Sequence, residues 1–243
     1  MEKKTTNNKY FILSVVFAII QAINLYLILF DKQSTNLLSL AFIILSASFG
    51  IVFSLDKKHY IFLIIAFIFT VIADYFLVIR FQETGDIFDQ SAGVTTFIVT
   101  QTFYFLFLLF SCDNRKVKIA NILTRIVLSI IVLIVAIIVL KEKLNYLVVV
   151  SLIYFSFLII NVIFAFIQHK KTGLIFAIGL VFFMLCDILI GLSVVFNAIF
   201  EVSTESFIYK LVFHPFNFAW LFYGISQTLI PLSIALNKNI KLN

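Results

Sequence analysis

The sequence predicts an all-α integral membrane protein, folded as a bundle of eight transmembrane helices. Hydrophobic residues make up 63% of the 243-residue chain and charged residues only 12%, against roughly 45–50% and 25% in soluble globular proteins. A soluble protein of this size could not bury so much apolar surface, so its surroundings must themselves be apolar. The net charge of +6 is therefore read through its distribution along the chain and does not indicate a nucleic-acid partner.

Eight runs of residues are long and apolar enough to cross a bilayer, for which a helix needs about 20 mostly apolar residues. They lie at 10–30, 36–55, 59–82, 90–112, 119–140, 145–168, 172–196 and 215–236. The first run is too long for the core of a signal peptide, and no small-residue cleavage site follows it, so we interpret it as a retained first span. The connections are short, and residues 1–243 are predicted to form a single polytopic membrane domain.

The Lys and Arg residues alternate between the two sides that eight spans define. Most of the eighteen, including Lys57-Lys58 and Lys170-Lys171, fall on the side of the N-terminus. The basic residues on the opposite side are Lys32, Arg80, Lys141, Lys143 and Lys210. By the positive-inside rule both termini are expected in the cytoplasm, with the chain in the plasma membrane. Arg125 lies within the fifth predicted span and is expected to extend toward the basic side.

Two of the twelve acidic residues, Asp74 and Asp187, lie inside predicted spans. An ionisable side chain there is costly, so it usually faces the bundle interior and marks a functional site; the alternative is a structural hydrogen bond between helices. His59 and Thr172 lie at the inner ends of the third and seventh predicted spans. Asp74 and Asp187 each lie fifteen residues further along the same span. At a rise of about 1.5 Å per residue, both carboxyls lie about 22 Å from the cytoplasmic end, in the outer half of the membrane.

Other polar side chains fall in the same layer of the membrane. Gln101 and Tyr104 in the fourth predicted span, and Tyr223 and Gln227 in the eighth, lie at a similar depth. The layer also contains Gln21, Asn24, Ser46 and Tyr154. A single amide in a span is more often a contact between helices than a site, so the prediction depends on the clustering. The cluster predicts a polar chamber that opens toward the outer leaflet.

No other pattern in the sequence indicates chemistry. The three His residues lie at the ends of spans, and one His near two Asp has no recognisable metal-ligand spacing. No Gly-rich phosphate loop, nucleophile elbow or CxxC motif occurs, and the two cysteines do not imply a disulfide framework. We therefore expect neither a metal nor a cofactor.

Four short patterns, in order along the chain, resemble those of the YhhN-like family, the eight-pass membrane proteins that include the lysoplasmalogenases. Ala73-Asp74 followed by Leu77 is similar to the family's third-span Gly-Asp pattern, and Cys186-Asp187 to its seventh-span Ser-Asp pattern. The other two patterns fall on Phe97, Gln101 and Tyr104 and on Tyr223, Gln227, Leu229 and Ile230. In the fourth span, Gln stands at position 101 where the family has His.

The resemblance implies a membrane hydrolase that cleaves the vinyl-ether bond of lysoplasmalogens to a fatty aldehyde and a glycerophospho-alcohol. That reaction begins with protonation of carbon and proceeds through capture of an oxocarbenium ion by water, so it needs one protonated carboxyl and one carboxylate. Burial and a second nearby carboxyl both favour keeping one proton on such a pair. Asp74 and Asp187 are therefore the expected acid and base, in either order. The residues expected to position water and the oxygens of the lysolipid are Gln101, Tyr104, Tyr223 and Gln227.

The residues alone leave two other functions open. Membrane Asp residues also serve as proton relays, so a proton-coupled carrier of a small or lipidic solute is the main alternative. Carriers favour discontinuous helices, and the scarcity of Gly and Pro in these spans argues against one. A non-catalytic membrane protein that binds lipid also agrees with Gln at position 101. Nothing in the sequence indicates an oligomeric state.

Overall fold

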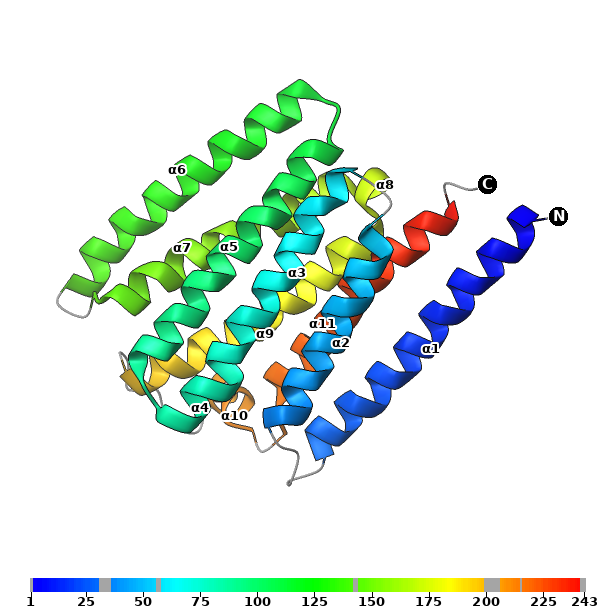
Figure 1. The fold of residues 1–243 in the computed structure, drawn as a ribbon. Coiled ribbons are helices and arrows are strands. Elements are labelled where there is room, and N and C mark those ends of the chain that lie inside the picture. The colour runs from blue at the N-terminus through cyan, green and yellow to red at the C-terminus, as the bar shows by residue number, and fades with distance from the viewer. Residues whose placement is uncertain are drawn as a thin grey trace.

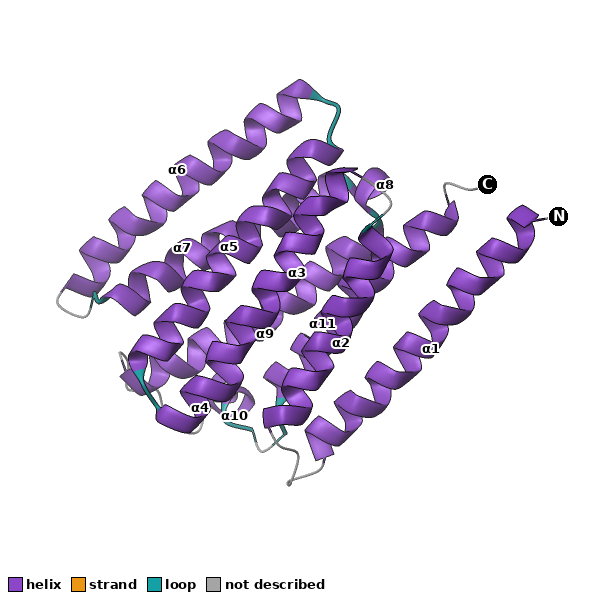
Figure 2. Cartoon of the chain, viewed as in Figure 1, coloured by secondary structure: helices purple, strands orange, loops and turns teal. Residues whose placement is uncertain are grey.

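The computed structural model describes residues 2–30, 36–55, 58–141, 144–198, 206–214 and 216–240. These residues form helices and connecting turns without strands (Figure 2). In this part of the chain eight helices are long and apolar enough to cross a membrane, which confirms the predicted fold class. Three basic residues used in the sequence analysis lie outside the described residues: Lys32, Lys57 and Lys143.

The first half of the chain contains four spans. The helices of the first, second and fourth are α1 (Glu2–Phe30), α2 (Asn36–Ser54) and α5 (Ile87–Ser111). The third span is composite, and its segments are η1 (Lys58–Tyr60), α3 (Ile61–Asp74), the π-helical η2 (Tyr75–Arg80) and α4 (Phe81–Thr84). The second half contains α6 (Arg115–Leu140), α7 (Tyr146–Ile167), α8 (His169–Thr172), α9 (Leu174–Ala198), α10 (Phe207–Val212) and α11 (Phe218–Ile240).

Polar side chains determine where several of these helices begin. Asp86 and Asn145 each accept a backbone N–H group of the first turn, at 2.9 Å, at the starts of α5 and α7. Asn217 does the same at 3.0 Å at the start of α11. Such caps satisfy N–H groups that the first helical turn leaves without a partner. Gly85, with φ 65°, ends α4 in the left-handed conformation that glycine adopts without strain.

The helices run alongside one another as a bundle with α1 and α6 at opposite edges (Figure 1). The most extensive contacts join α9 to α11, α3 to α5, and α5 to α7. At the edges, α1 packs on α11 and α2, and α6 packs on α7. The start of α1 and the end of α11 lie at the same end of the bundle (Figure 1), as an even number of crossings requires.

The outer surface of the bundle is apolar and its interior contains buried polar groups. On α6, Ile130, Ile134 and Ile138 are 52%, 51% and 64% exposed. Lipid tails are as apolar as these side chains, so their exposure has no cost in a bilayer. Gln101 and Asn161, in contrast, are buried between helices. This distribution is the one expected when the surrounding solvent is lipid.

A glycine brings the two helices with the most extensive contacts close together. A Cβ atom added at Gly179 on α9 would lie 2.7 Å from Cγ1 of Ile230 and 3.2 Å from its backbone nitrogen, on α11. Small residues at helix interfaces allow this close approach in membrane proteins. The spacing of α9 and α11 matters for the site, because each helix carries a residue of the polar layer.

Candidate functional site

Asp74 lies where α3 passes into the π-helical η2, and only 3% of the residue is exposed. Its Oδ2 accepts a hydrogen bond from the hydroxyl group of Tyr223 on α11. π-Helical turns are rare in proteins, and many of them lie at functional sites. On α5, Gly93 faces this part of the third span, because a Cβ atom there would lie 3.2 Å from the carbonyl oxygen of Ala73. The Asp74 carboxyl is thus held where α3, α5 and α11 meet.

Asp187 lies within α9 and has a matching arrangement. Its Oδ2 accepts a hydrogen bond of 2.5 Å from the hydroxyl group of Tyr154 on α7. Tyr154 is itself buried. Each membrane Asp is therefore oriented by a tyrosine hydroxyl from a different helix. A hydrogen bond of this kind is stronger when the carboxyl is ionised, so it holds the group in place through a change of charge.

A row of four aromatic rings joins the two Asp–Tyr pairs. The ring centroids of Tyr154 and Phe97 are 5.8 Å apart, those of Phe97 and Phe183 are 5.5 Å apart, and those of Phe183 and Tyr223 are 5.5 Å apart. These distances are typical of favourable aromatic contacts. All four rings are buried, so the row runs through the interior of the bundle. Both Asp–Tyr pairs therefore border one interior region, which has an aromatic wall.

Three of the four residues predicted to position substrate carry a buried polar atom without a hydrogen-bond partner among the described residues. These atoms are Nε2 of Gln101, the hydroxyl oxygen of Tyr104 and Nε2 of Gln227. The Tyr104 hydroxyl lies beside Thr70 but not in hydrogen-bond geometry. Buried polar groups in folded proteins nearly always have a partner, and water or a ligand supplies it where the protein does not. The structure thus presents several polar groups that are ready to bind something else.

A second polar group of Gln227, its backbone carbonyl, lacks its usual partner. Pro231 lies four residues later within α11, and proline has no backbone N–H to donate to the carbonyl oxygen of residue i−4. The backbone carbonyl of Gln227 therefore lacks its usual helical partner. Its side-chain amide and its backbone carbonyl can together serve as donor and acceptor for a polar ligand.

The side chain of Gln101 is oriented by a polar chain that extends to α6. Asn161 on α7 donates through Nδ2 to Oε1 of Gln101 at 2.8 Å and to its backbone carbonyl at 2.9 Å. Arg125 in turn donates through Nη2 to Oδ1 of Asn161 at 2.8 Å. Because the amide oxygen of Gln101 is already used, its NH₂ group is the part left to act as a donor.

Arg125 extends in the expected direction but stays inside the bundle. Its Nη2 reaches Oδ1 of Asn121, one helical turn nearer the basic end of α6, at 3.5 Å. Its side chain is 6% exposed and lies between the rings of Phe105 and Phe157, with the guanidinium carbon 4.3 and 4.7 Å from the ring centroids. Ring faces attract a cation, and the bond to Asn161 satisfies part of the guanidinium. These contacts offset the cost of holding the charge inside the bundle.

Two further polar residues of the predicted layer join helices at the edge of the bundle. Gln21 on α1 donates to the hydroxyl group of Ser46 and, at 3.1 Å, to the carbonyl oxygen of Phe42, both on α2. This is the usual role of a polar side chain between membrane helices. Gln21 and Ser46 are therefore accounted for by the contact of α1 with α2.

Tyr154 and Asn161 contact the candidate site residues Asp187 and Gln101, and the sequence analysis gave neither of them a role there. Tyr154 was placed in the polar layer, and the need of Asp187 for a donor on a neighbouring helix was the available signal. Asn161 gave a weaker signal, since a single Asn in an apolar span is commonly a helix contact. In the part of the chain that the structure describes, no three His, Cys, Asp or Glu side chains gather as a metal-ligand group.

An eight-helix membrane bundle with two Asp–Tyr pairs in its interior defines a polytopic membrane protein with a candidate carboxyl site within its spans. The sequence profile of the YhhN family matches residues 32–234, and the chain belongs to this family. The match confirms the resemblance seen in the four short patterns. Comparisons with curated proteins and with solved structures gave no match.

Proposed function

We propose that this protein is a membrane hydrolase that cleaves the vinyl-ether bond of lysoplasmalogens, releasing a fatty aldehyde and a glycerophospho-alcohol. One observation carries the proposal: Asp74 and Asp187 are each oriented by a tyrosine hydroxyl and border one interior region of the bundle. Two such carboxyls can divide the roles of acid and base. The family resemblance implies the same reaction.

The proposed reaction begins when one Asp, in its protonated form, gives its proton to the vinyl carbon that is not bonded to oxygen. The carbon bonded to oxygen becomes an oxocarbenium ion, and the other Asp, as a carboxylate, takes a proton from the water that attacks this carbon. The resulting hemiacetal then breaks its bond to the glycerol oxygen. That oxygen takes the proton held by the second Asp, and the hemiacetal hydroxyl returns its proton to the first, so both carboxyls are restored.

The surrounding side chains suit this chemistry. The unpartnered NH₂ groups of Gln101 and Gln227 and the hydroxyl of Tyr104 can bind the attacking water and the glycerol oxygens. The rings of Phe97 and Phe183 lie between the two Asp–Tyr pairs, and ring faces stabilise a neighbouring cation such as the oxocarbenium ion. The lipid chain of the substrate would extend among the apolar side chains of the bundle or into the bilayer.

The proposal also includes a location. We place the protein in the plasma membrane with both termini in the cytoplasm, because the basic residues concentrate on the side of the N-terminus. Its partners are then the bilayer and a lysoplasmalogen or related lysolipid that reaches the site from the membrane.

A proton-coupled carrier is the second candidate, because helical hydrogen bonding is interrupted in two helices of the site. The π-helical η2 follows Asp74 directly, and Pro231 lies within α11. Broken or irregular helices are typical of the binding sites of carriers. In a carrier the two Asp residues would bind and release protons without breaking a bond of the solute.

The direct test is aldehyde release from lysoplasmalogen by the purified protein in detergent, with an ester lysolipid of the same head group as control. We expect aldehyde from the vinyl-ether lipid and no fatty acid from the ester lipid. Absence of aldehyde at saturating substrate would overturn the hydrolase. Proton-coupled solute uptake in proteoliposomes would then establish the carrier, and lysolipid binding without turnover or uptake would establish a lipid-binding protein.

A further inference from the structure

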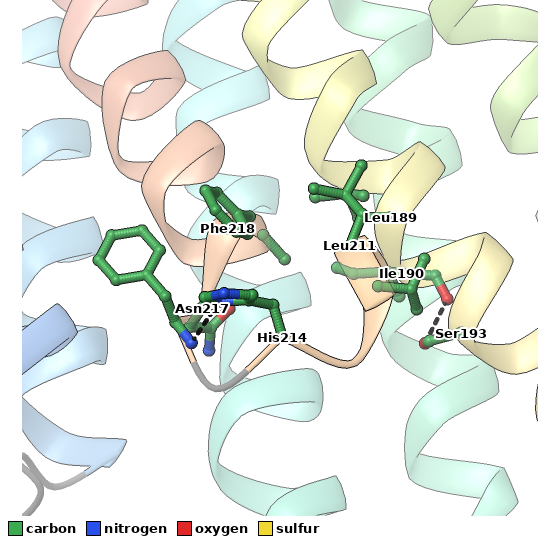
Figure 3. A pocket seen from close by; sticks show the side chains of 10 residues that line it. Leu189, Ile190, Ser193, Leu211, His214, Asn217 and Phe218 are labelled. Carbon is green, nitrogen blue, oxygen red and sulfur yellow. Dashed lines mark hydrogen bonds between the residues drawn. The ribbon is translucent and has the colours of Figure 1, made fainter. Parts of the chain in front are cut away.

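A cavity of about 280 Å³ lies between α9, α10 and the start of α11 (Figure 3). Its apolar lining includes Leu189 and Ile190 on α9 and Leu211 on α10. His214 and Asn217, just before α11, contribute polar groups. At roughly 30 Å³ per water molecule, the cavity has room for a small polar group but not for a long lipid chain.

The cavity adjoins the Asp–Tyr site on both of its main walls. Ile190 is three residues after Asp187 on α9, and Ala219, another lining residue, is four residues before Tyr223 on α11. Residues three or four apart share a face of a helix. In the predicted topology both steps lead outward, so the near edge of the cavity lies about one helical turn, or about 5.4 Å, outward from the two side chains. Ser193 and Asn217, each six residues away, lie about 9 Å outward.

Hydrogen bonds within the protein determine which group each polar side chain at the cavity has left for a ligand. Nδ1 of His214 accepts the backbone N–H of Phe216 at 3.0 Å, so the neutral ring carries its proton on Nε2. Oδ1 of Asn217 accepts the backbone N–H of Trp220 at 3.0 Å, which leaves the NH₂ group of Asn217 as a donor. Ser193, in contrast, donates to the carbonyl oxygen of Ile190 at 2.7 Å, so its oxygen is left as an acceptor.

This set of two donors and one acceptor matches a glycerophosphate group. Phosphate oxygens only accept hydrogen bonds, and the N-terminus of a long helix such as α11, next to the two donors, further favours an anion. The free hydroxyl of a lysolipid's glycerol can donate to Ser193. We propose that this cavity binds the phosphodiester head group of the lysolipid, an inference that rests on the proposed function.

The position of the cavity agrees with the covalent structure of such a lipid. Four bonds separate the phosphate ester oxygen from the ether oxygen at the other end of the glycerol, and this length is comparable to one helical turn. A head group held by Asn217 and Ser193, with the glycerol directed inward, therefore brings the ether bond toward the level of Asp187 and Tyr223. The cavity and the two Asp–Tyr pairs form successive parts of one binding site.

The test measures the affinity of purified wild type and variants in detergent for an alkyl-ether lysophosphatidylethanolamine, which has no vinyl-ether bond to cleave. The headless alkylglycerol of equal chain length serves as second ligand. Asn217→Asp keeps the acceptor that caps α11, because Asp and Asn cap equally well, but replaces the donor with a negative charge. Asn145→Asp is the matched control, because Asn145 caps α7 in the same way, at 2.9 Å, away from the cavity.

We expect Asn217→Asp to raise the Kd for the phosphodiester lipid about tenfold and the Kd for alkylglycerol less than twofold, since like charges repel at a binding site. Asn145→Asp should change neither Kd, and His214→Ala should raise only the Kd for the phosphodiester lipid. Equal effects on the two ligands, no effect, or no binding of the phosphodiester lipid by the wild type would overturn the head-group site. Selective loss of binding in a protein that releases no aldehyde would leave this site standing and overturn the proposed hydrolysis alone.

Discussion

The two membrane Asp residues can be changed in charge without a change in shape. We expect Asp74→Asn and Asp187→Asn each to lower aldehyde release by at least about 10²-fold, the lower end of the usual range for an acid or base catalyst. The double variant should be about as slow as the slower single one, because the residues act as a unit. The midpoint of thermal unfolding should hold or rise, because each change removes an ionisable group that is buried (Asp74) or half-buried (Asp187).

Asp86→Asn is the matched control for these variants. Asp86 is exposed and caps α5 at 2.9 Å, and Asn is an equally good cap, so the wild-type rate should remain. If Asp74→Asn kept most of the wild-type rate, the acid–base assignment would be wrong and the carrier would become the better explanation.

The contact of Arg125 with Asn161 predicts that removing Asn161 lowers the stability more than removing Arg125. Asn161→Leu leaves a buried guanidinium without its 2.8 Å acceptor and should lower the free energy of unfolding by about 2–3 kcal/mol. Arg125→Met removes the charge and should cost about 1 kcal/mol. Adding Arg125→Met to Asn161→Leu should restore part of the lost stability. Unfolding of the purified variants in detergent measures all three, and an Arg125→Met variant less stable than Asn161→Leu would contradict the prediction.

Sequence reasoning located single residues better than contacts between them. Asp74 and Asp187 are identifiable because a charge in an apolar span is costly and rare. The bond of Tyr154 to Asp187 and the chain from Arg125 through Asn161 depend on how each helix is rotated about its axis. A membrane helix that is apolar on nearly every side gives little sign of that rotation, so the partners of Arg125 inside the bundle could not be predicted.

The helices themselves follow from hydropathy and length, while their irregular parts do not. Eight apolar runs predict eight spans because each run must satisfy its own backbone inside the bilayer. The π-helical turn of η2 and the short helices α8 and α10 have no comparable signal, since they arise from tertiary packing and local turns. The turn after Asp74 is thus a feature of the site that only the structure provides.

Two glycines on α9 allow a test of how α9 and α11 pack. Gly179→Ala places a methyl group 2.7 Å from the side chain of Ile230 and 3.2 Å from its backbone nitrogen, so it should destabilise the protein by about 1–3 kcal/mol. Because α9 and α11 carry Asp187 and Tyr223, aldehyde release should also fall. Gly191→Ala meets nothing within 4 Å and should be neutral or stabilising by up to about 1 kcal/mol. Equal unfolding midpoints for both variants would show that the helices have room to adjust.

For the whole molecule, the charge distribution and the fold together predict an orientation. An even number of spans puts both termini on one side of the membrane, and the start of α1 and the end of α11 do lie at one end of the bundle (Figure 1). The fold does not distinguish inside from outside, so the side depends on the basic residues. They predict that the termini lie in the cytoplasm and the turn at Gly85 outside.

Reporter tags at each terminus and in two turns test this orientation in cells. Tags at both termini and after Asp113 should report from the cytoplasm, and a tag between Gly85 and Asp86, which leaves the cap of α5 in place, should report from outside. The orientation also determines the source of the substrate, because the Asp–Tyr pairs and the cavity lie toward the end of the bundle that contains Gly85. A cytoplasmic report from the tag at Gly85, with external termini, would turn this site toward the inner leaflet, and lysolipid would then have to reach it from the cytoplasmic side.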